Sequence, residues 1–218
     1  GDNGGPDAFG SVLAVSLSLL VVLASSIAFL YFWKGEDGFI ISGPSSALKS
    51  WEWDYREIIG ANNETISDLD GEGVVVCIVD SGIDLSHPDL RGVDLDGWMD
   101  SINGQKDPYD DEGHGTAMSG IIVADGGLNG LAKGVSLLVA KAINETGVGS
   151  DESVSQSVDW CVQGGADVIS LSLGGAQGFG SGIFTTDQLE QSVEDAMDNG
   201  VFVIASAGND GQDDDGDV

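Results

Sequence analysis

Basic residues are scarce in this chain, which has 7 Lys and Arg against 37 Asp and Glu and a formal net charge of −30. So acidic a surface repels nucleic acid and anionic lipid head groups, and we exclude both as partners. Two interpretations of the surplus stay open. One is a solvated acidic shell suited to salt-rich surroundings, which the scattered positions of the acids favour; the other is attraction of cations or basic substrates. With 41% hydrophobic residues, the composition is globular rather than disordered.

Cysteine is also scarce. The chain has two, Cys77 and Cys161, which is too few for a disulfide framework. Cys77 lies in an apolar run and Cys161 in a helix-like run, and this setting predicts two buried free thiols. A single bridge between them is the alternative, so cysteine content does not identify a compartment.

Residues 8–33 contain no charged side chain, and this segment is long enough to cross a bilayer with some tilt. It ends in an aromatic triplet before Lys34, which is typical of a membrane interface. A cleaved signal peptide would need a basic start and a small-residue cleavage site, and a buried core helix is usually shorter. We therefore predict a short tail at residues 1–7 and a transmembrane helix at 8–33, which would anchor a domain that lies outside the cytoplasm.

Residues 34–72 are predicted to form a linker followed by an approach segment. The approach segment, WEWDYREIIGA at 51–61, is expected to pack on the domain that follows. From residue 73 onward, apolar strand-like runs alternate with helix-like segments. We expect strands at 74–80, 135–143, 166–175 and 201–209, and helices at 115–124 (buried), 151–165 and 185–200. This alternation predicts an α/β fold, a doubly wound parallel sheet with helices on both faces.

Polar residues follow the strands at the edge where such sheets gather reactive groups. Asp80 ends the first strand, His114 precedes the buried helix within DDEGHGTAMSG, and Ser206–Asp210 follow the last strand. Each is ordinary on its own, because Asp and Asn beside glycine usually form turns and a lone His is usually structural. The three together, in this order, indicate a catalytic site.

Four blocks, VVVCIVDSGIDLSHPDL, DDEGHGTAMSG, DVISLSLGG and VFVIASAGNDG, resemble the subtilisin-like serine proteases in the same order. The resemblance covers residues 73–212. It implies a subtilisin-like catalytic domain, partial at its C-terminus, over 73–218, and hydrolysis of peptide bonds by an Asp-His-Ser triad without a cofactor. Asp80 matches the aspartate that orients the imidazole, His114 the general base, and Asn209 the side-chain donor of the oxyanion hole.

The resemblance also implies where a polypeptide substrate would bind in extended form. The strand that pairs with the substrate backbone is matched by Ser172, Leu173 and Gly174. A wall of the specificity pocket is matched by Ala205, Ser206 and Ala207. Asp89 matches a calcium ligand of several relatives, with the loop 125–130 completing that site, so structural calcium is an expectation. A turn role for Asp89 is the alternative.

The nucleophile that the resemblance requires is a serine in a G-T-S-x-A motif, and these 218 residues contain no such motif. GTAMSG continues the histidine block, and Ser119 lies too far along the helix for His114 to reach. We therefore expect the chain alone to be inactive. A fragment of a longer protease is favoured over a natural short form, because half a sheet would expose an apolar face and the chain starts with Gly rather than Met. Too few residues lie between Lys34 and Gly73 for a folded propeptide.

Two other functions are alternatives to the serine endopeptidase. A non-catalytic, membrane-anchored peptide-binding homologue would keep the same residues without the serine. A nucleotide-binding domain would need a phosphate-cradling glycine loop after the first strand, and only Gly82 is found there. The glycosylation triplets at Asn63 and Asn144 support export only faintly.

Overall fold

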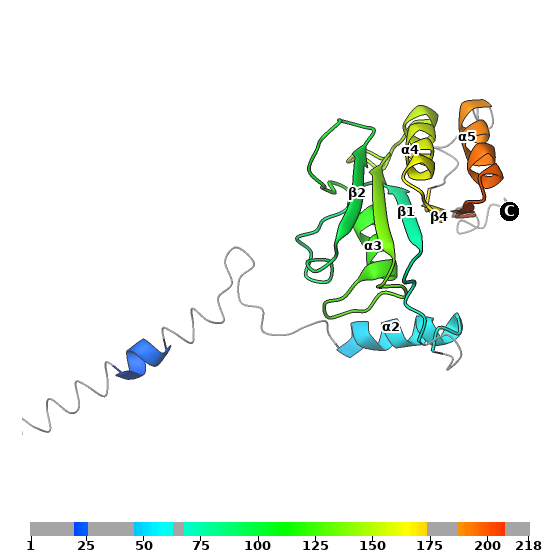
Figure 1. Ribbon diagram of the computed structural model, residues 1–218. Coiled ribbons are helices and arrows are strands. Elements are labelled where there is room, and N and C mark those ends of the chain that lie inside the picture. The colour runs from blue at the N-terminus through cyan, green and yellow to red at the C-terminus, as the bar shows by residue number, and fades with distance from the viewer. Residues whose placement is uncertain (1–19, 26–45, 63–67, 174–186, 208–218) are drawn as a thin grey trace, which may run out of the picture. The chain divides into compact units, whose positions relative to one another are not determined.

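The computed structural model describes residues 20–25, 46–62, 68–173 and 187–207 (Figure 1). The chain divides into two compact units, Gly1–Ser45 and Ser46–Val218, so the division falls inside the segment predicted as a linker. In the first unit, residues 20–25 are helical. Within the described ranges, no helix has the length and apolar character needed to cross a membrane. The span expected at 8–33 lies outside those ranges except for residues 20–25, and it stays a prediction.

The second unit is built on one sheet of five parallel strands in the order β2-β3-β1-β4-β5. The strands are β1 (Val75–Asp80), β2 (Leu95–Asp100), β3 (Ser136–Lys141), β4 (Val168–Leu171) and β5 (Phe202–Ala205). Because all of them run in one direction, their carboxyl ends share one edge of the sheet. Asp80 and Lys141 are direct neighbours across β1 and β3 at that edge.

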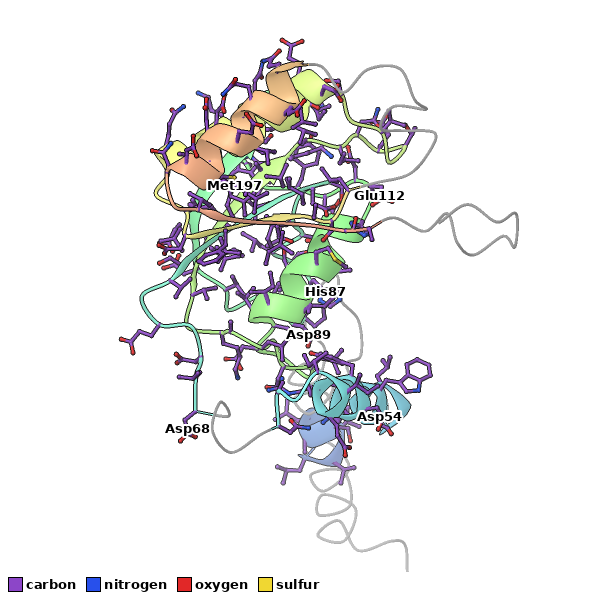
Figure 2. All side chains as sticks on the ribbon, turned by 90° about the vertical axis from the view of Figure 1, so that its right-hand side faces the viewer. Asp54, Asp68, His87, Asp89, Glu112 and Met197 are labelled. Atoms are coloured by element: carbon purple, nitrogen blue, oxygen red, sulfur yellow. A yellow bond between two sulfur atoms is a disulfide. The ribbon has the colours of Figure 1, made fainter. Side chains whose placement is uncertain are left out.

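Helices cover the sheet on both sides. These helices are α3 (His114–Val123), α4 (Asp151–Gln163) and α5 (Asp187–Asp198). A further helix, α2 (Ser46–Ile58), lies against the loop at Asn129 and Gly130. Figure 2 shows the sheet nearly edge-on, with α4 and α5 on one side and α3 on the other. The predicted doubly wound parallel sheet is therefore confirmed.

Strand β1 shows why its sequence is apolar throughout. Successive side chains of a strand point to opposite faces, so both faces of a central strand must be buried. Cys77 and Val79 enter the core under α4 and α5, whereas Ile78 enters the core under α3. All three have no exposed surface, which is why the run VVCIVD contains no polar residue before Asp80.

The two cysteines are joined in a disulfide, so the prediction of free thiols is wrong. Cys77 lies on β1 and Cys161 on the last turn of α4, and their Cα atoms are 5.8 Å apart. Both side chains are buried in the core that α4 and α5 form on the sheet. The pairing depends on how α4 lies across β1, which periodicity along the chain does not report.

Two further differences from the expected elements concern β2 and α3. Strand β2 was not predicted because its sequence, LDGWMD, interleaves acids with apolar residues and lies half-buried at the sheet edge. Helix α3 forms as expected but is buried along one stripe only, at Gly115, Ser119 and Val123. Ile121, on the opposite side, is 46% exposed.

Helix α2 contains residues 51–58 of the predicted approach segment 51–61 and contacts the domain through polar side chains. Arg56 Nη1 donates to the carbonyl oxygens of Asn129 (3.2 Å) and Gly130 (3.3 Å). Asn129 Nδ2 donates to Glu52 Oε1 at 3.3 Å. In Figure 2, the labelled His87 and Asp89 lie between α3 and α2.

Candidate active site

The imidazole of His114 and the carboxylate of Asp80 meet at the carboxyl edge of the sheet. His114 Nδ1 lies 2.9 Å from Oδ1 and 3.0 Å from Oδ2 of Asp80. The Asp80 side chain is 1% exposed and that of His114 is 45% exposed. A buried carboxylate therefore holds one ring nitrogen while the rest of the ring faces outward.

Helix α3 begins at His114 with every N–H of its first turn accepted by a side chain. Asp110 accepts from the N–H groups of Gly113 (2.8 Å) and Thr116 (2.9 Å). Glu112 Oε2 accepts from His114 N at 2.8 Å, and Ser81 Oγ accepts from Gly115 N at 2.9 Å. The start of a helix otherwise leaves such donors without partners. This capping fixes the residue that carries the imidazole.

Glycine is required where the Asp80 loop meets the start of α3. A Cβ on Gly115 would lie 2.3 Å from the carbonyl oxygen of Gly82. A Cβ on Gly82, whose φ is +127°, would lie 2.1 Å from the carbonyl oxygen of Tyr109. These two glycines allow the backbones to approach closely enough for His114 to reach Asp80.

The carboxylates around His114 have different environments. Burial raises the pKa of the Asp80 carboxyl above its ordinary value, although hydrogen bonds from His114 and from the Ser81 N–H act to lower it. For Asp110, burial also acts to raise the pKa, but hydrogen bonds from Thr116, Gly113 and Ser81 outweigh it and lower the pKa below its ordinary value. The charged form of Asp110 is thus favoured by the donors that it caps.

The residues predicted to bind substrate follow two adjacent strands. Ser172 and Leu173 directly follow β4, and Ser206 and Ala207 directly follow Ala205 at the end of β5. Ser206 N donates to Leu171 O at 3.2 Å, and Ser206 Oγ donates to Leu173 O at 3.0 Å. The two strand ends are thereby joined. Gly174 and Asn209 lie outside the described residues, and the substrate-binding and oxyanion roles stay predictions.

Asp89 holds a loop through backbone amides. Its Oδ1 accepts from Gly127 N (2.5 Å) and Leu128 N (3.2 Å), so it organises the loop that was expected to share a calcium ion with it. No group of three or more His, Cys, Asp or Glu side chains that could hold a metal occurs among the described residues. The calcium expectation is therefore not supported, and the contacts show Asp89 holding the backbone of a loop distant in sequence.

The sequence profile of the subtilase family matches residues 71–217. The chain belongs to the subtilase family. It is 37% identical to thermitase of Thermoactinomyces vulgaris over 173 residues, covering 78% of this chain and 54% of thermitase. It is 35% identical to subtilisin DY of Bacillus licheniformis, covering 71% of this chain and 54% of that protein.

The fold comparison agrees with the family. A crystal structure of a cold adapted subtilisin-like serine proteinase matches with a TM-score of 0.55 and 30% identity, over 65% of this chain and 49% of the other. The subtilisin-like fold inferred from the resemblance is thus confirmed. This subtilase chain spans about half the length of the curated relatives that it matches.

Three residues that shape the site were missed by sequence reasoning. Asp110 and Ser81 cap α3, and Lys141 is a buried cation beside Asp80. Asp110 could have been identified, because an acid shortly before a predicted helix start is a typical capping residue. Lys141 lies within the predicted strand 135–143, and nothing local in the sequence signals that its ammonium group is buried.

Proposed function

We propose that these residues form part of a serine endopeptidase in which His114 is the general base, oriented by Asp80, for a serine that lies outside them. The single observation that carries this proposal is the contact of 2.9 Å between His114 Nδ1 and the buried Asp80 carboxylate in a member of the subtilase family. The proposed substrate is a polypeptide in extended conformation.

The geometry suits the chemistry of a general base. When Nδ1–H donates to Asp80, the ring holds the tautomer whose Nε2 lone pair is free to take a proton. Among the described residues, none hydrogen-bonds to Nε2, and the ring is half exposed. Asp80 would stabilise the imidazolium that forms when His114 takes the serine's proton, and His114 would then return that proton to the leaving amine.

Two described serines near the start of α3, Ser119 and Ser81, do not offer a nucleophile. Ser119 is fully buried one turn into α3, and its Oγ donates to Gly115 O at 2.8 Å. Ser81 Oγ is engaged with Asp110 (2.9 Å) and Gly115. The proposal therefore assigns the nucleophile to a segment outside these 218 residues.

An uncovered apolar surface supports a further segment. On β5, Phe202 and Ile204 alternate with Val203, which packs into the core under α4 and α5. Phe202 and Ile204 therefore point to the opposite face, where they are 74% and 59% exposed. Surfaces of this kind are usually covered. We propose that the segment carrying the serine covers them.

For location, we propose that residues 8–33 anchor the protein in a membrane and that the protease domain lies outside the cytoplasm. The support is the uncharged apolar segment and the Cys77–Cys161 disulfide, since such bonds persist mainly in oxidising compartments. In a membrane preparation washed at alkaline pH, the protein should stay in the pellet, whereas a variant lacking residues 1–34 should be released. Release of both would refute the anchor.

The function is tested by fluorophosphonate labelling of the complete gene product that contains these residues. Labelling should occur in the wild type and be lost in His114→Ala. The chain has two histidines, so His87→Gln is a matched control that should label normally. If the complete wild-type product does not label, the enzyme proposal fails and the peptide-binding homologue takes its place.

A further inference from the structure

Lys141, the last residue of β3, is a fully buried ammonium group beside the catalytic pair. Its Nζ donates to the carbonyl oxygens of Ser81 (2.6 Å) and Ile143 (2.8 Å) and to Asp111 Oδ1 (2.6 Å). An ammonium group has three N–H donors, and these three acceptors satisfy all of them. The group therefore has a defined position rather than a flexible one.

These contacts join the two loops that carry Asp80 and His114. Ser81 directly follows Asp80, and Asp111 lies three residues before His114. Lys141 is itself the strand neighbour of Asp80 across β1 and β3. One side chain thus connects the Asp80 loop, the His114 loop and the sheet from which both extend.

A second set of contacts holds the same loop around the ammonium group. The ring of Tyr109 lies against Lys141, with Nζ 5.0 Å from the ring centroid, which is within cation–π range. Tyr109 Oη donates to Asp100 Oδ2 at 3.0 Å, at the end of β2. The loop that leads to His114 is therefore fixed to the ends of β2 and β3 on one side and to Ser81 on the other.

The burial of the Lys141–Asp111 ion pair favours a role in geometry over a role in stability. Asp111 is 33% exposed while Lys141 is fully buried, so the lysine bears most of the desolvation cost. Because that cost offsets much of the attraction, a buried ion pair often adds little net stability compared with an apolar side chain of similar size. What an apolar residue would not replace is the direction of three hydrogen bonds.

We propose that Lys141 is a positioning residue for the Asp80–His114 pair, acting through Asp111 and the Ser81 carbonyl. The inference rests on the proposed function, since it concerns the same two residues. Lys141 touches neither substrate nor the proton that moves. It sets the distance and direction from which His114 Nδ1 meets Asp80.

The test is nuclear magnetic resonance on the 218-residue chain with ¹⁵N-labelled histidine. With only His87 and His114 present, each ring is observed separately, and His87 is an internal reference for folding. In the wild type, His114 should show a protected Nδ1–H and a single tautomer. In Lys141→Met the Nδ1–H should exchange with solvent about tenfold faster or more, the factor expected when a charge-assisted hydrogen bond is lost.

A second variant and a control separate positioning from general damage. Asp111→Asn removes the ion pair at its exposed end and should change the His114 signals in the same direction but less. Combined with Lys141→Met, it should add nothing, because both changes break one contact. Lys133→Met, which breaks a surface pair with Asp125 (2.7 Å), should leave both histidines unchanged.

The outcomes are distinguishable. Unchanged His114 signals in a folded Lys141→Met chain would overturn the inference and leave the protease proposal intact. If Lys141→Met also disturbs His87, the chain is misfolded and Asp111→Asn decides: changed His114 signals there support the inference, and unchanged ones overturn it. In a wild-type chain that circular dichroism shows to be folded, a ring without a protected Nδ1–H would refute the Asp80–His114 pair itself. Failure of fluorophosphonate labelling would refute the activity alone, because the resonance measurement needs no serine.

Discussion

Removing the Cys77–Cys161 disulfide should cost this domain a large part of its stability. The bond joins Cys77 on β1, three residues before Asp80, to Cys161 on α4. It closes a loop between residues separated by 84 positions in the sequence. For a loop of that length, the chain-entropy relation gives about 15 cal/mol/K, or about 4.5 kcal/mol at room temperature. Measured losses on removing a native disulfide are usually about 2–5 kcal/mol, so we expect Cys77→Ala with Cys161→Ala to lose an amount in that range.

The measurement is urea unfolding followed by circular dichroism, with the double variant compared with oxidised and with reduced wild type at one salt concentration. The double variant and the reduced wild type should unfold at similarly low urea. Before this comparison, the oxidised wild type is unfolded without reductant and treated with a thiol reagent. It should not react, because both cysteines are in the disulfide. Alkylation of both cysteines in that check, or a loss of less than about 1 kcal/mol in the double variant, would refute the reasoning.

Three further predictions concern the start of α3 and the surface charge. Gly115→Ala should lower the free energy of unfolding by about 1–3 kcal/mol, because its Cβ would collide with the Gly82 carbonyl, and the protected His114 Nδ1–H should be lost. Gly120→Ala is the matched control: its Cβ would meet nothing within 4 Å, and the free energy of unfolding should rise by about 0.5–1 kcal/mol. Asp110→Asn should lose about 2 kcal/mol at neutral pH, because charged helix-cap hydrogen bonds are removed. Since the pKa of Asp110 is lower in the folded chain, this difference should be full above the ordinary value of 3.8 and vanish as the pH falls through the folded pKa; a difference independent of pH would contradict the assignment. With a net charge of −30, the melting temperature should rise steeply up to molar salt, and a flat response would count against a solvated acidic shell.

The helices and strands were predictable where the local sequence pattern depends directly on how deeply the element is buried. The run VVCIVD predicts β1 because a strand buried on both faces must be apolar along its length. The capping acids and terminal glycines predict α4 with boundaries close to those observed. Strand β2 was not predicted, because Asp96 and Gly97 interrupt the apolar pattern of an edge strand that is only half buried.

The site was predictable in part. Asp80 and His114 were identified from motif order, and their meeting follows from parallel strands ending at one edge. The disulfide and the role of Lys141 were not predictable, because each depends on a contact between elements distant in sequence. Lys141 Nζ reaches Ser81 and Asp111 only after β3 has paired with β1.

The structure also bears on the two interpretations of the acidic surplus. Three consecutive acids, Asp110, Asp111 and Glu112, precede Gly113-His114, and by charge alone they would suggest attraction of basic substrates. Asp110 uses both carboxylate oxygens on amides and hydroxyls, Asp111 pairs with Lys141, and Glu112 accepts the His114 N–H. Of the three, only Asp111 is neutralised by a cation, whereas Asp110 and Glu112 keep their charge and use their oxygens to cap the turn. We therefore attribute the acidity of this loop to the construction of the His114 turn, and the solvated shell remains the better account of the acids scattered elsewhere.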